Sequence, residues 1–221
     1  MESATQAIRA YYRVASAHFD ADAAALERSD AAFYLDIARR AGGPVLEFGC
    51  GTGRIGIEIV RAGPSYTGVE VSTAMLERFE EKLEAEPEEV RKRARVKDGD
   101  ARSTHLERRF ACVLAPFDLL AHLLDDDDRR RALNRCRAHL APSGVLALDV
   151  SVPTYPRLGE LVEAGESKPQ VELERDGGGK SKIRRTATIQ ADAANQQLRY
   201  HREWLEVGPR GGTKSIAEAD L

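Results

Sequence analysis

The chain has 221 residues, of which 42% are hydrophobic and 31% charged, a composition that excludes disordered and fibrous classes. The 33 basic and 36 acidic residues leave a formal net charge of −3, so no summed positive field favours a nucleic-acid partner. No segment has the pattern of a signal peptide or the length of a membrane span, and the three cysteines lack the spacing of a disulfide framework. We therefore expect a cytoplasmic protein with reduced thiols, no nucleic acid and no membrane partner. The sequence leaves the oligomeric state open, and a homodimer is the assembly to test first.

The N-terminal pattern predicts two helices within residues 5–41. Apolar residues recur at helical spacing from Ala7 to Phe19 and again from Phe33 to Ala38. The run Gly42-Gly43-Pro44 ends the second helix.

Short apolar runs then alternate with amphipathic stretches. The expected strands are residues 45–48, 66–71, 94–97, 110–114 and 145–150. Helical patterns between successive strands indicate parallel pairing through right-handed crossovers. The predicted fold class is therefore α/β, a doubly wound and mostly parallel sheet in which ligands bind beyond the carboxyl ends of the strands.

Residues 171–216 predict an antiparallel β meander. Side chains alternate in polarity from Ile183 to Ile189 and from Leu198 to Trp204. Turn-rich breaks at residues 176–179, 191–195 and 208–212 separate the expected strands.

The strongest local signal is the stretch Val45 to Gly56, VLEFGCGTGRIG, in which a strand runs into a glycine-dense turn and then a helix. Glycines let the backbone approach a ligand, and the helix start offers N–H groups and the positive end of a dipole. Gly51, Gly53 and Gly56 also satisfy the dinucleotide spacing, so an NAD(P)-dependent oxidoreductase is one interpretation. Glu47 at the strand end favours the other, because a carboxylate there suits a cationic amino-acid group better than a pyrophosphate.

The stretch Glu47-Phe48-Gly49-Cys50-Gly51-Thr52-Gly53 resembles the first motif of the class I S-adenosylmethionine-dependent methyltransferases. The resemblance continues in order along the chain and covers about residues 8–150, which makes it more specific than any single pattern. The later matching segments are residues 68–72, 98–102, 114–123 and 140–146.

The resemblance implies S-adenosyl-L-methionine as the cofactor. By the same resemblance, Glu70 would bind both ribose hydroxyls, and Asp100 would accept a hydrogen bond from the adenine amino group, a complementary pairing. The expected cofactor-binding residues are Glu47, Gly49, Cys50, Gly51, Gly53, Arg54, Glu70, Val71, Met75, Asp100, Ala101, Arg102 and Pro116.

The segments around residues 115–118 and 11–13 bear on the methyl acceptor. Ala115-Pro116-Phe117-Asp118 differs from the Asn/Asp-Pro-Pro-Tyr of enzymes that methylate nucleic-acid bases or protein amides. Tyr11-Tyr12-Arg13 and the meander resemble the small-molecule branch, including sugar-amine N-methyltransferases. That resemblance implies that Tyr12 and His122 flank a small-molecule acceptor, an amine or a hydroxyl.

Three residues are therefore the catalytic candidates, namely His122, Tyr12 and Asp118. An imidazole titrates near neutral pH and can receive the acceptor's proton, whereas Asp118 can orient the acceptor or take that proton itself. Asp118 departs from the neutral polar residue frequent in that branch, so the acceptor type stays open. His122 beside leucines and Tyr12 on an amphipathic helix also fit plain packing roles, and a cofactor-binding module without turnover is a further alternative.

The domain prediction has three parts: N-terminal helices that cap the substrate (1–43), a cofactor-binding core (44–152) and an antiparallel β lid (153–221). Relatives usually continue past residues 215–221 into a helix and a last strand, so we expect a C-terminally shortened or incomplete chain. Residues 198–221 supplying the last two strands of the main sheet would contradict this. Asp125–Asp128 followed by Arg129–Arg131 predicts a surface helix with three i,i+4 acid–base pairs and no metal.

Overall fold

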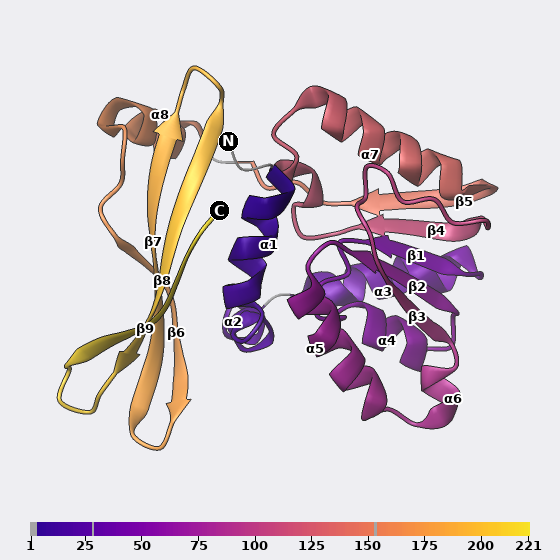
Figure 1. Cartoon of the computed structure of the whole chain (residues 1–221), viewed down its shortest axis with the longest axis horizontal. Helices are drawn as coiled ribbons and strands as arrows, with labels where there is room; N and C mark the ends of the chain where they lie inside the picture. The colour runs from indigo at the N-terminus through magenta and orange to yellow at the C-terminus, as the bar shows by residue number, and fades with distance from the viewer. Residues whose placement is uncertain (1–3, 28, 153) are drawn as a thin grey trace. The chain divides into compact units, whose positions relative to one another are not determined.

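The structure is a computed structural model that describes residues 4–27, 29–152 and 154–221. The boundary predicted at residue 153 therefore lies outside the described residues. The chain divides into two compact units, Ser29–Ser151 and Met1–Arg28 together with Val152–Leu221. We call the first the core unit and the second the β-sheet unit, and both are drawn in Figure 1.

The core unit contains a five-stranded sheet in the order β3-β2-β1-β4-β5, with every neighbouring pair parallel. The strands are β1 (Val45–Phe48), β2 (Tyr66–Glu70), β3 (Ala94–Asp98), β4 (Phe110–Ala115) and β5 (Leu140–Leu148). The strand order reverses between β1 and β4, so the doubly wound α/β prediction is confirmed and the switch point lies beside β1.

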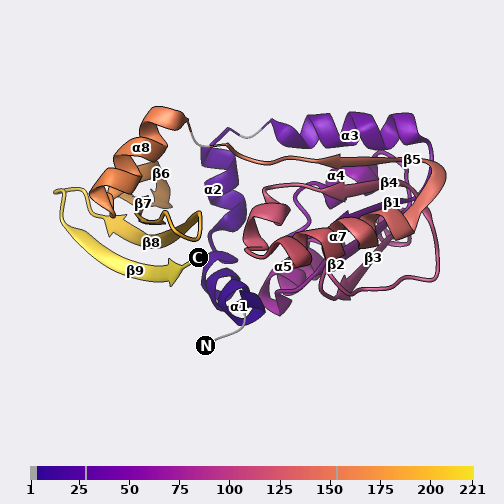
Figure 2. The same cartoon turned by 90° about the horizontal axis from the view of Figure 1, so that it is seen from above.

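Helices cover both faces of this sheet, as Figure 1 and Figure 2 show. They are α3 (Asp30–Ala41), α4 (Gly56–Arg61), α5 (Thr73–Glu84), α6 (Glu88–Arg91), the 3₁₀ helix η1 (Leu119–His122) and α7 (Asp126–His139). Strand residues alternate between faces: Val45 belongs to the cluster with α3, α4 and α5, whereas Leu46 and Phe48 belong to the cluster with Cys136 of α7. The all-buried β1 is therefore sandwiched between two apolar layers.

The structure corrects two predictions in the core unit. Strand β5 spans Leu140–Leu148 rather than residues 145–150, with a register shift in its pairing with β4 between Phe110 and Cys112. The ion pairs of α7 join residues three apart, such as Asp126–Arg129 and Asp127–Arg130, so the predicted i,i+4 spacing was wrong.

The β-sheet unit confirms the predicted meander. Its antiparallel order is β6-β7-β8-β9. The elements are α1 (Ala4–Ala15), α2 (Phe19–Ala25), α8 (Tyr155–Ala164), β6 (Gln170–Gly178), β7 (Ser181–Asp192), β8 (Gln197–Val207) and β9 (Thr213–Asp220). Strands β8 and β9 pair within this sheet, so among the described residues 198–221 none joins the parallel sheet.

The N-terminal helices differ from the prediction of two. The first expected helix is divided into α1 and α2, and the break falls where the Ser16 hydroxyl donates to the carbonyl of Arg13, a back-bond that competes with helix continuation. The second expected helix is α3, which packs on β4, β5 and α4 within the core unit. No described helix is both long and apolar enough to cross a membrane.

A buried carboxylate ties α2 to the sheet of the β-sheet unit. Asp22 is 2% exposed and accepts hydrogen bonds from Arg175 Nε at 2.8 Å, Arg185 Nη1 at 2.9 Å and Trp204 Nε1 at 2.8 Å. Such a charge is tolerated in the interior only because it is fully paired.

Candidate active site

The loops that follow β1, β2 and β3 are joined by backbone hydrogen bonds at the carboxyl edge of the parallel sheet. Gly49 N donates to the carbonyl of Val69 at 2.8 Å, and Gly99 N donates to the carbonyl of Glu70 at 2.9 Å. Parallel strands bring their carboxyl ends to one edge. The predicted residues at positions 49–53, 70–71 and 100–102 are therefore neighbours there.

The Glu70 side chain lies directly against the glycine loop. Its Oε2 accepts from Gly51 N at 3.0 Å, and its Oε1 accepts from Val71 N and Ser72 N, each at 2.9 Å. Burial raises the pKa of Glu70, and the three backbone N–H groups act in the opposite direction by favouring the charged form. The carboxylate predicted to bind a ribose thus lies beside the glycine loop predicted to approach the cofactor.

The glycines of this loop have different physical roles. Gly53 has φ +76°, and a Cβ there would lie 2.2 Å from Phe79 Cδ2, so packing against α5 requires glycine. Gly51 has φ +55°, and a Cβ there would meet no atom within 4 Å. Gly51 therefore lines an open cradle, the feature expected where a ligand approaches the backbone.

Two predicted residues of the loop point into the interior. Glu47 is 2% exposed, and Tyr66 Oη donates to its Oε2 at 2.7 Å. Burial raises the pKa of Glu47 to about 8 despite that hydrogen bond. Cys50 is also buried, with its Sγ 2.7 Å from where a Cβ on Gly68 would lie. Burial raises the pKa of this thiol, so Cys50 is no activated nucleophile.

Arg54 and Met75 flank the loop on the helical side. The Arg54 guanidinium forms a bidentate pair with Asp30 of α3, at 2.7 and 2.8 Å, and lies 5.9 Å from the centroid of the Phe117 ring. Met75 is buried in α5. Asp30 was not predicted as a site residue, because its contact depends on residues 24 positions apart.

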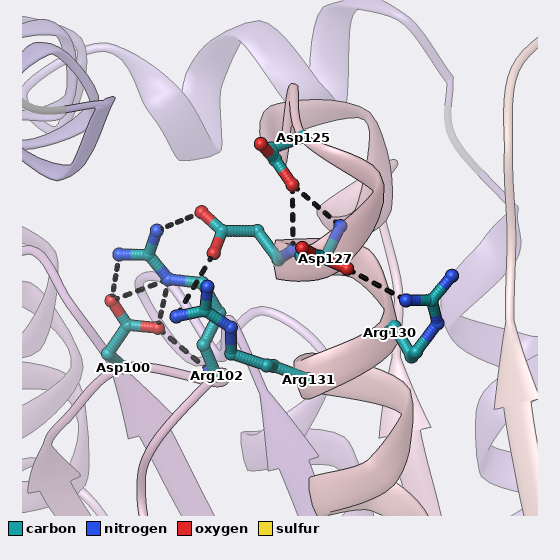
Figure 3. A network of polar contacts seen from close by, with 7 residues as sticks. Asp100, Arg102, Asp125, Asp127, Arg130 and Arg131 are labelled. Atoms are coloured by element: carbon teal, nitrogen blue, oxygen red, sulfur yellow. Dashed lines mark hydrogen bonds and ion pairs between the residues drawn. The ribbon is translucent and has the colours of Figure 1, made fainter.

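The loop after β3 carries Asp100, Ala101 and Arg102. Both Asp100 oxygens accept from Arg102, whose Nε lies at 2.9 and 3.1 Å and whose Nη2 lies at 2.5 Å. Ala101 is half-buried between them. The sequence predicted both charged residues but not their direct pairing, which Figure 3 shows.

The loop after β4 is strained and braced. Phe117 has φ +60° and Asp118 has φ +59°, and side chains in this region cost of order 1–3 kcal/mol each. Asp149, just beyond β5, accepts from Phe117 N at 2.6 Å and Asp118 N at 3.3 Å, and also from Tyr34 Oη. Burial and this last hydrogen bond raise the pKa of Tyr34.

Two further contacts fix the same loop. Ser151 Oγ donates to Asp118 at 2.6 Å, and Ser151 N donates to the same carboxylate. Buried Pro116 begins the loop, and half-buried His122 ends η1. Sequence analysis missed Asp149, although an acidic residue at the carboxyl end of a parallel strand is a signal that could have identified it.

The third catalytic candidate, Tyr12, lies in α1 of the β-sheet unit. Its ring centroid is 4.9 Å from that of Tyr11 and 6.3 Å from that of Phe19. Tyr12 and His122 belong to different units, so their meeting at the acceptor stays a prediction.

Comparison with known proteins bears on which of the two cofactors the glycine loop holds. Residues 45–144, which span β1 to the start of β5, match the family described as a methyltransferase domain. This part of the chain therefore has the sequence of a methyltransferase domain. The chain is 46% identical over 109 residues to an uncharacterised methyltransferase of Bacillus licheniformis, a match covering 49% of this chain and 47% of the relative. The chain spans roughly half the length of the curated relatives it matches, between 41% and 56%.

Solved methyltransferase structures share the fold. The S-adenosylmethionine-bound amino pentose methyltransferase CalS10 from Micromonospora echinaspora aligns with a TM-score of 0.67 at 22% identity, covering 92% of this chain and 80% of that one. The glycopeptide N-methyltransferase MtfA, complexed with sinefungin, aligns with a TM-score of 0.53 at 28% identity, covering 80% and 69%.

The residues of the methyltransferase domain fit S-adenosylmethionine. The open cradle at Gly51 admits a ligand against the backbone, and the neighbouring Glu70 oxygens are acceptors suited to ribose hydroxyls. The Asp100 carboxylate is the acceptor that an adenine amino group requires. When bound, the cofactor supplies an electrophilic methyl carbon on a sulfonium.

Proposed function

We propose that the chain transfers a methyl group from S-adenosylmethionine to an amine or hydroxyl of a small molecule, with an amino sugar as the first acceptor to test. One observation carries the proposal: the Leu119 side chain of η1 lies against Gly49, with its Cδ1 2.9 Å from where a Cβ on Gly49 would be. The helix η1, which bears His122, therefore packs directly on the cofactor loop. A side chain that receives the acceptor's proton must lie close to the reacting groups, and His122 at the end of η1 is our candidate for that role.

The braced β4 loop supplies the positioning that methyl transfer needs. An acceptor nitrogen or oxygen forms the new bond to the methyl carbon as the carbon–sulfur bond breaks and its electron pair goes to sulfur. Alignment and exclusion of water are the protein's main contributions to such a displacement. The acceptor also releases a proton. We assign His122 to receive this proton and Asp118, which Ser151 holds in place, to orient the acceptor.

The character of the acceptor is inferred from solved methyltransferases. Among the structures with this fold are an amino pentose methyltransferase and a sugar N-methyltransferase, and these support an amine of a sugar. The net charge of −3 supports a small-molecule acceptor rather than a nucleic acid. We also propose a cytoplasmic protein that works without a membrane partner and forms a homodimer, the last to be tested by light scattering.

The test is turnover with S-adenosylmethionine and a panel of amino sugars, each paired with its hydroxyl analogue. We expect a product heavier by one methyl group, together with S-adenosylhomocysteine, and a lower turnover rate in His122→Ala at unchanged affinity for S-adenosylhomocysteine. Binding of the cofactor with no methylated product across the panel would favour the binding module without turnover.

A further inference from the structure

Arg102 is shared between two carboxylates that come from different parts of the core unit. Its Nε and Nη2 donate to Asp100 in the same loop, and its Nη1 donates to Asp128 in the first turn of α7. The three side chains are only 17–25% exposed. Figure 3 shows Arg102 against Asp100 on one side and the start of α7 on the other.

Three N–H groups of Arg102 engage both oxygens of Asp100. A carboxylate offers about four lone-pair sites. Oδ1 accepts from Arg102 N at 2.8 Å and Nε at 2.9 Å, and Oδ2 accepts from Nε at 3.1 Å and Nη2 at 2.5 Å. A further N–H donor, such as an adenine amino group, therefore competes with the guanidinium for Asp100.

Asp128 is held at a fixed place beside Arg102. The side chain of Asp125 caps α7 by accepting from the backbone N–H groups of Asp127 at 2.6 Å and Asp128 at 3.4 Å, which orders this turn. Arg131 Nη1 lies 3.7 Å from Asp128 Oδ1. The neighbouring Asp127 instead pairs with Arg130 at the exposed surface, so only one of these two acidic side chains is directed at Arg102.

We propose that Asp128 is a positioning residue for the adenine end of the cofactor site. It keeps the Arg102 guanidinium paired when Asp100 turns an oxygen from Arg102 to the adenine amino group. Without the Asp128 charge, Arg102 has Asp100 as its main counter-charge, and the adenine amino group competes poorly. This inference rests on the proposed function, in which the cofactor is S-adenosylmethionine and the Asp100 carboxylate accepts a hydrogen bond from its adenine amino group.

Calorimetric titration with two ligands measures this effect without turnover. S-adenosylhomocysteine carries the amino group, and S-inosylhomocysteine carries a carbonyl in its place. We expect the wild type to prefer the first by about tenfold or more, the effect of a hydrogen bond to a charged group. We expect Asp128→Asn to lower that preference to roughly threefold or less, mainly by weakening the binding of S-adenosylhomocysteine. Asp127→Asn, the matched charge change one residue away, keeps the wild-type preference.

A second variant tests the same competition from the other side. Arg102→Ala removes the guanidinium from Asp100, so the preference for S-adenosylhomocysteine rises above that of the wild type, and this result stands even if Asp128→Asn fails to fold. The inference is overturned if Asp128→Asn weakens the binding of both ligands equally, or if Arg102→Ala leaves the preference for S-adenosylhomocysteine unchanged or lowers it. Absence of S-adenosylhomocysteine binding to the wild type would instead refute the proposed function.

Discussion

Substituting alanine at Gly51 and at Gly53 separates the cofactor-binding role of the glycine loop from its packing role. Both residues have positive φ, +55° and +76°, so each alanine costs about 1–2 kcal/mol of backbone strain. Only at Gly53 does the new Cβ meet the Phe79 ring, at 2.2 to 2.6 Å, and such overpacking adds about 1–3 kcal/mol. We expect Gly53→Ala to lower the free energy of unfolding by about 2–5 kcal/mol, and Gly51→Ala by about 1–2 kcal/mol.

For cofactor binding we expect the larger effect from Gly51→Ala, although Gly53→Ala has the larger effect on stability. The methyl group of Gly51→Ala enters the open cradle, so we expect the Kd for S-adenosylhomocysteine to rise about tenfold. Urea unfolding followed by far-UV circular dichroism measures stability, and calorimetry measures Kd. Trp204, the single tryptophan, lies in the β-sheet unit and reports whether that unit is unaffected. Wild-type binding in Gly51→Ala would show that the cofactor does not lie on this cradle, and equal stability losses would refute the clash at Gly53.

Three other predictions follow from single buried or bracing carboxyl groups. Asp149→Ala removes the acceptor that braces the β4 loop. The turnover rate should therefore fall about tenfold while the Kd for S-adenosylhomocysteine stays within about twofold. A similar loss of turnover and of affinity for S-adenosylhomocysteine would contradict this. Burial raises the pKa of Glu47 from 4.5 to about 8, so between these pH values the native state holds a proton that the unfolded state has released. Stability therefore falls as the pH rises through this range, with a slope of at most about 1.4 kcal/mol per pH unit. Urea unfolding of Glu47→Gln should show a flatter profile over the same pH range, and a slope equal to that of the wild type would be the contrary result. Asp22→Ala leaves Arg175 and Arg185 without their buried partner and should cost about 3–5 kcal/mol by Trp204 fluorescence, whereas a loss under about 1 kcal/mol would show that the network is dispensable.

The strands of the core could be predicted because burial leaves a direct trace in the sequence. Strand β1 is buried on both faces, so Val45 to Phe48 forms an apolar run with a single polar residue. The start of strand β5 was predicted too late, because Pro142 and Gly144 are residue types typical of turns. Among the described residues β5 pairs only with β4 and forms the edge of the sheet, where both residue types are tolerated.

The candidate site could be predicted only where its residues follow strands. Glu70 and Asp100 were identified because they occupy acidic positions of the family's motifs, at or just after the end of a parallel strand, whereas Asp149 was counted as part of a strand. Asp128 was assigned to a local i,i+4 pattern, yet its contact with Arg102 joins residues 26 positions apart. Contacts between separate loops depend on the tertiary fold, and spacing along the helix carries no information about them.

Calorimetric titration of the chain with S-adenosylhomocysteine and, separately, with NADH tests the central claim most directly. We expect saturable binding of S-adenosylhomocysteine at one site per chain, lost in Glu70→Ala, and no heat of binding with NADH. Binding of NADH in place of S-adenosylhomocysteine, or undiminished binding of S-adenosylhomocysteine by Glu70→Ala, would contradict a methyl-donor site at the tips of β1, β2 and β3.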